Sequence, residues 1–182
     1  QAILIALLVT PFALGFRSLA KRAGRKRRKD GTILWALPLA FLVLGSLVAF
    51  CPIFMGNGQV LAQALLSSQS IPYLPLTLVV KGLLVYLLLR NGAYGGTLTP
   101  SFALGIGSGY LVTLLMTVVG IHLDPALGML LGATVFLGTT LQAPLTAIAL
   151  SQGFTGQSLS LTIPLVLATG VSYVIRMRWE KR

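Results

Sequence analysis

One short segment of the sequence combines the residue types that can bind a small anion through backbone groups. In order, it contains Gly95, Gly96, Thr97, Leu98, Thr99, Pro100 and Ser101. Glycines let a chain turn sharply and leave its backbone unshielded, and proline fits the first turn of a helix. We therefore expect a helix to begin here, with the amides of Thr97, Leu98 and Thr99 unpaired at its positive end, where an anion is stabilised. The alternative interpretation is a simple turn between two helices.

A second chemical feature is Lys81, which lies inside the apolar run 73–90. A cation inside a membrane is costly and usually functional. Only three acidic residues occur in the chain, and none is close to Lys81 in the sequence. We expect Lys81 to raise the electrostatic potential along an anion path without contacting the ion. A purely structural pairing is the alternative.

Residues for catalysis or metal binding are scarce. The three acids Asp30, Asp124 and Glu180 all lie at the ends of apolar segments, and the chain has a single histidine, His122, and a single cysteine, Cys51. A membrane-embedded enzyme or proton relay needs acids or histidines within the bilayer, and a cysteine cluster or disulfide needs a second cysteine. We therefore expect no enzymatic activity, no catalytic residue, no metal and no cofactor.

Composition and charge distribution predict an integral membrane protein. Apolar residues make up 55% of the chain and charged residues 9%, and the mean hydropathy is +0.89. Of the 14 Lys and Arg residues, eight lie within 17–29 and four within 176–182. Cations confined to segments beside apolar runs indicate cytoplasmic loops, which places loop 21–29 and the C-terminus in the cytoplasm of a multi-pass protein of the cell or inner membrane. No recognition surface for nucleic acid accompanies the charge, so the expected surroundings are a lipid bilayer.

The apolar runs predict an all-α protein. Five runs approach the roughly 20 residues of a spanning helix, and two are shorter. The five are 1–20, 32–50, 73–90, 98–119 and 157–176, and the shorter two are 124–141 and 143–152. The joins between several of them carry no charge, and two cytoplasmic ends require an even number of crossings between them. We therefore expect at least one broken or re-entrant helix, with the join at Gly92–Thr97 at membrane depth.

Small residues at helical spacing predict where helices pack. Gly105 and Gly109 are four residues apart, as are Gly128 and Gly132. Glycines at this spacing let two helix backbones approach closely in lipid. In front of the second pair, Asp124 followed by proline is typical of a helix N-cap.

At this point the sequence resembles a known family. Gly92–Gly105 is similar to the filter segment of the CLC family of voltage-gated chloride channels and chloride/proton antiporters. Gln142–Ile148 resembles the Ala-Pro-Leu-Thr helix start of that family, and Gly56–Gly58 and Lys81 fall where it carries similar features. The resemblance covers nearly the whole chain. It implies one transmembrane domain, 1–182, that is the second half of a CLC-type inverted repeat, begins near the middle of the subunit and lacks the final helix.

The resemblance also implies a function and partners. In the family, the amides that match Thr97 and Leu98 bind chloride, while a serine, a gating glutamate and a tyrosine come from segments outside this chain. The expected function is transport of chloride or a similar inorganic anion, as a channel or a chloride/proton antiporter. The expected partners are the missing N-terminal half of the subunit and a second subunit bound through 143–176. Two departures are Leu98, where the family usually has an aromatic residue, and Gly153–Gly156, which lacks a carboxylate the family often has.

A second function, from a different class, fits the same residues. A non-conducting membrane scaffold or half-domain could keep the helix-packing glycines while lacking a pore. The residues that separate a channel from an antiporter would lie outside this chain.

Overall fold

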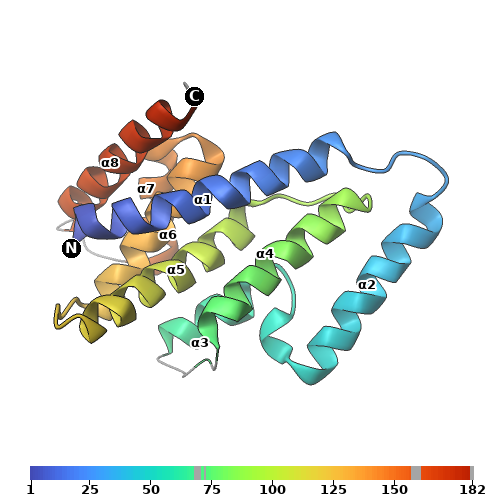
Figure 1. Ribbon diagram of the computed structural model, residues 1–182, viewed down its shortest axis with the longest axis horizontal. Helices are drawn as coiled ribbons and strands as arrows, with labels where there is room; N and C mark the ends of the chain where they lie inside the picture. Colours follow the sequence, from blue (N-terminus) through green and yellow to red (C-terminus); the bar gives the residue numbers. More distant parts are fainter. Residues whose placement is uncertain (68–70, 72, 157–160, 181–182) are drawn as a thin grey trace.

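The computed structural model describes residues 1–67, 71, 73–156 and 161–180. All regular elements in these ranges are helical, which confirms the all-α prediction (Figure 1). The elements are α1 (Ala2–Arg25), α2 (Ile33–Phe50), the 3-10 helix η1 (Pro52–Phe54), α3 (Gln59–Leu66), α4 (Leu74–Arg90), α5 (Leu98–Val118), α6 (Pro125–Leu141), α7 (Pro144–Thr155) and α8 (Thr162–Glu180).

Helix length separates spanning from broken elements. Within the described residues, α1, α2 and α5 are long and apolar enough to cross a membrane. Helix α6 is apolar but has 17 residues, and α7 has 12, a length of about 18 Å at 1.5 Å per residue. The hydrocarbon core of a bilayer is about 30 Å thick, so α7 is too short to span it. The expected broken helices are therefore present. Residues 157–160 of the predicted run 157–176 lie outside the described part.

Helices α5 and α6 form the centre of the fold, and their glycines face one another. A Cβ added to Gly109 would lie 2.1 Å from the carbonyl oxygen of Gly128, and one added to Gly132 would lie 2.4 Å from that of Gly105. Contacts this close are possible only between backbones without side chains. The predicted packing role of the two glycine pairs is confirmed.

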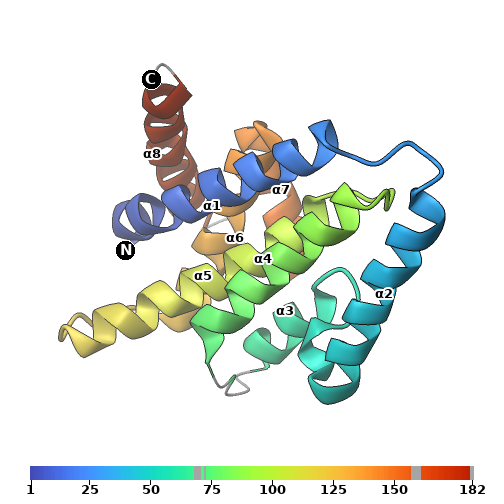
Figure 2. The same cartoon turned by 45° about the vertical axis from the view of Figure 1, so that its right-hand side comes forward.

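The remaining helices surround this pair unevenly. Helix α1 crosses α6 and α8 (Figures 1 and 2), and its Phe16 packs against Phe136 of α6 with ring centroids 5.7 Å apart. An ion pair between Arg17 and Glu180 joins α1 to the end of α8. Helix α2 lies at the opposite side of the molecule from α8 in both views, and most of its apolar side chains are exposed.

Helix ends follow the local sequence. Asp124 caps α6 by accepting a hydrogen bond from the amide of Ala126 at 3.0 Å, as predicted. Between α6 and α7, Gln142 adopts a left-handed conformation with φ of 61°, and Pro144 begins the next helix. The uncharged join is thus a two-residue break between consecutive helices.

The α5–α6 contact generates a stability prediction. Gly109→Ala should destabilise the intact protein by about 1–3 kcal/mol, because the added methyl group must push the two backbones apart. Gly45→Ala in α2 is the matched control, since a Cβ there meets nothing within 4 Å. Thermal unfolding in detergent should show a lower Tm for Gly109→Ala and an unchanged Tm for the control. Equal Tm values for both variants would contradict the packing role.

Candidate anion-binding site

Helix α5 begins where the sequence predicts. Thr97 is its N-cap, with φ of −91° and ψ of 2° and no hydrogen bond from its side chain. The first backbone bond of the helix runs from the amide of Ser101 to the carbonyl of Thr97 at 2.9 Å. The amides of Thr97, Leu98 and Thr99 therefore have no partner within α5, and Pro100 has no amide hydrogen. Three donors are left at the positive end of a 21-residue helix.

The approach to these amides is open within this chain. Gly95 and Gly96 are exposed, and residues 97–99 are half-buried. A Cβ built on Gly95 would meet nothing within 4 Å, and one on Gly96 would meet only the amide nitrogen of Leu98 at 4.0 Å. Packing among the described residues therefore does not require these two glycines. Their lack of side chains keeps the space in front of the helix start clear.

The basic loop between α1 and α2 contacts the linker that leads into α5. The Nη2 atom of Arg27 donates a hydrogen bond to the carbonyl of Gly92 at 2.8 Å, and its guanidinium lies 3.3 Å from the ring centroid of Tyr94. The amide of Arg28 also donates to the carbonyl of Arg90 at 3.0 Å. Sequence reasoning missed these contacts, because Arg27 and Gly92 are 65 residues apart.

These contacts bear on the expected position of the join Gly92–Thr97 relative to the membrane. Gly92 and Tyr94, in the first half of this join, contact Arg27 of the basic loop. Tyr94 is also 93% exposed. The membrane depth of the join Gly92–Thr97 stays a prediction. The loop also brings positive charge to the linker in front of the candidate site.

Lys81 is buried, with 2% of its surface exposed, but its partners are not carboxylates. Its Nζ atom donates to the carbonyl oxygens of Phe54 and Gly56, each at 2.8 Å, and lies 3.4 Å from that of Met55. The structure thus places the ammonium against the loop that follows η1. Its predicted electrostatic effect on an anion path stays a prediction.

A buried hydroxyl group also lies in the first turn of α5. Ser101 is fully buried, and its Oγ atom has no hydrogen-bond partner among the described residues. Buried hydroxyl groups normally have a partner. The sequence contained no signal for this, because the burial of one serine depends on how the helices pack.

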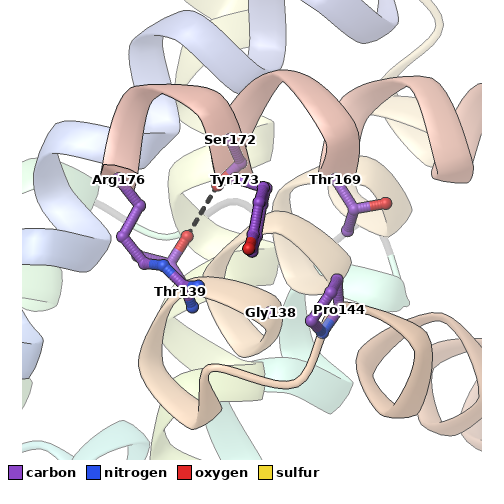
Figure 3. Close-up of a pocket in the computed structure, with 7 residues that line it drawn as sticks. All are labelled: Gly138, Thr139, Pro144, Thr169, Ser172, Tyr173 and Arg176. Atoms are coloured by element: carbon purple, nitrogen blue, oxygen red, sulfur yellow. Dashed lines mark hydrogen bonds between the residues drawn. The ribbon is translucent and has the colours of Figure 1, made fainter. Parts of the chain in front are cut away.

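A second polar cluster, between α6, α8 and the start of α7, does not resemble an anion site (Figure 3). Thr139 donates to the carbonyl of Val135 at 2.8 Å, so the hydroxyl of Ser172 must be the donor in their 2.7 Å contact. Both hydroxyl hydrogens are then used, and the cavity has room for about one water molecule. Arg176 is buried beside it, and its Nε atom has no partner among the described residues. A water molecule, which both donates and accepts, suits this cavity better than an anion.

The fold defines a polytopic helical membrane protein with broken helices. The family model described as "Voltage gated chloride channel" matches residues 1–177. The chain therefore belongs to this family.

A solved structure has the same fold. The crystal structure of a CLC-type fluoride/proton antiporter superposes with a TM-score of 0.77 at 22% sequence identity, covering 98% of this chain and 44% of that chain. The present chain thus spans less than half the length of that protein. No curated protein matches the chain.

The Arg27 contacts generate a prediction about the linker. Arg27→Gln removes the stacking on Tyr94 and weakens the bond to Gly92, interactions worth about 1–3 kcal/mol together. Backbone amides in 91–96 of the intact protein should then exchange with deuterium about tenfold faster, as measured by mass spectrometry. Arg25→Gln, an exposed neighbour, is the control and should leave this exchange unchanged. Equal exchange in both variants would show that Arg27 does not hold the linker.

Proposed function

We propose that this chain forms one wall of a pathway for chloride or a similar inorganic anion, such as fluoride, in a channel or a proton-coupled antiporter. The observation that carries the proposal is the start of α5, where three amides without helical partners face an approach kept clear by two glycines. Amides at a helix N-terminus are directed donors that suit a small anion. Family membership and the fold shared with a fluoride/proton antiporter support the same activity.

The helix start alone is too weak to hold a dehydrated ion. A helix dipole contributes about 0.3–1 kcal/mol at an exposed surface and up to about 2 kcal/mol when partly buried. Further donors must therefore come from the rest of the subunit, where the family resemblance places a serine and a tyrosine, together with the gating glutamate. The ammonium group of Lys81 adds a favourable field without contacting the ion.

A non-conducting scaffold is the competing function, and one observation separates the two. The α5–α6 glycines would serve a scaffold equally well, because they pack helices. Gly95 and Gly96, in contrast, have no packing neighbours that explain them. An open backbone in front of unpaired amides favours ion binding over a scaffold.

A homodimer formed through residues 143–176 belongs to the same proposal. Leu145 of α7 and Ile163 of α8 expose large apolar side chains on this segment. Ile163→Trp should shift the intact protein from dimer to monomer in detergent, because the larger ring cannot fit a matched apolar interface. Size-exclusion chromatography with light scattering measures the change. An unchanged dimer would count against this interface.

The backbone-amide site is tested by deleting one amide. In the intact protein in liposomes, Thr97→Pro removes a donor and should lower anion flux at least about tenfold, the lower end of the effect of one hydrogen bond to a charged group. Thr97→Val is the matched control: it keeps the amide, and the Thr97 side chain makes no capping bond to lose. Its flux should be close to that of the unchanged protein. Normal flux through Thr97→Pro would show that the amide site is wrong.

A further inference from the structure

We infer that Lys81 is a positioning residue for the candidate anion site, because it holds the loop 54–58 against the first turn of α5. The inference rests on the proposed function, since it concerns the alignment of the same amides. The inferred role is mechanical and depends on the contacts of Lys81. It is additional to the electrostatic effect that the sequence predicts for its charge.

The first step is the way Lys81 holds the loop. An ammonium group has three donors and no acceptor, and here three successive carbonyl groups, those of Phe54, Met55 and Gly56, surround it. The lysine is almost fully buried. Removing it would leave the carbonyl group of the buried Phe54 without this donor, which costs about 1–3 kcal/mol, and would also release the carbonyl groups of the exposed Met55 and Gly56. The conformation of this loop therefore depends on Lys81.

The second step is the contact of the same loop with α5. Gly58 ends the loop with φ of 107°, a region open to glycine. A Cβ on Gly58 would lie 2.7 Å from the Cβ of Ala103 and 3.8 Å from the Cα of Pro100. It would also lie 3.8 Å from the Cε of Lys81. The loop backbone, the lysine stem and the first turns of α5 are thus in direct contact.

The third step connects this contact to the anion. Pro100 directly follows the three unpaired amides, so a shift of this turn changes where those donors point. Directed donors lose much of their effect when misplaced by about 1 Å. Helix α3, which follows the loop, packs in the same cluster as Phe102 and Ala103 of α5 through Leu61. Lys81 and α3 therefore support α5 from the same side.

Variants at Gly58 disturb the contact between the loop and α5 while the charge of Lys81 stays in place. Gly58→Ala keeps Lys81 but presses the loop against Ala103 and strains the backbone at φ of 107°. Combining it with Ala103→Gly relieves the overlap and leaves the backbone strain in place. Gly56→Ala is the matched control: it lies in the same loop with φ of 61°, and a Cβ there meets nothing within 4 Å. Lys81→Met removes the anchor itself. The readouts are the chloride and fluoride dependence of flux in liposomes of the intact protein, and hydrogen exchange of residues 97–103.

We expect Lys81→Met and Gly58→Ala each to raise the half-saturating anion concentration about tenfold, per folded protein, and to speed exchange in 97–103. Gly56→Ala should behave like the unchanged protein, and the Gly58→Ala/Ala103→Gly pair should recover the part of the loss that the overlap with Ala103 causes. A change in half-saturation distinguishes positioning from simple destabilisation, which lowers the amount of folded protein and leaves half-saturation unchanged.

Several outcomes would overturn the inference. If Lys81→Met raises half-saturation while Gly58→Ala does not, the lysine acts through its charge alone. If the double variant shows no improvement over Gly58→Ala, the contact with Ala103 does not carry the effect. If the unchanged protein carries no anion flux, the proposed function fails, and the exchange data then decide the inference separately. Faster exchange of 97–103 in Lys81→Met and Gly58→Ala, but not in Gly56→Ala, would still support positioning, and unchanged exchange would refute it.

Discussion

Backbone N–H and C=O groups at a helix end inside an apolar protein need hydrogen-bond partners, because no water is present to replace the lost hydrogen bonds. The breaks in this chain meet that requirement in different ways. After η1, the carbonyl groups of 54–56 receive hydrogen bonds from Lys81. After α4, the carbonyl of Gly92 receives one from Arg27, and the carboxylate of Asp124 caps α6.

The start of α5 differs from these breaks. Its amides at Thr97, Leu98 and Thr99 have no partner within the helix, and the two glycines in front of them leave the approach open. At the breaks after η1 and α4, and at the start of α6, the chain supplies a side chain that pairs with the backbone. At this position an external anion supplies the missing acceptor in the proposed function, which makes the unpaired amides a binding site and removes the cost of leaving them unpaired.

The surroundings of α5 explain how such a helix start can be held in place. The backbone contact with α6 through Gly109 and Gly128 leaves little freedom for the helix to slide or rotate. The loop that Lys81 anchors contacts the first turn from another side, and the basic loop contacts the linker before it. The site is still one-sided, in keeping with a chain that spans 44% of the antiporter structure it resembles. In the proposed function, its remaining donors come from the rest of the subunit.

The local chemistry of the sequence determined much of this protein. Long apolar runs specify helices, glycine and proline specify their ends, and the start of α5 depends only on neighbours within Gly95–Ser101, so its three unpaired amides could be predicted. The glycine pairs predicted close packing because their spacing places them on one helix face.

Only the tertiary structure decided which distant groups meet. The carbonyl partners of Lys81 lie 25 to 27 residues away, and Gly92 lies 65 residues from Arg27. A search for acidic partners in the sequence could not find them, because backbone carbonyl groups are present at every residue and carry no sequence signal. Their position relative to a side chain is set by the packing of whole helices, which local propensity does not specify.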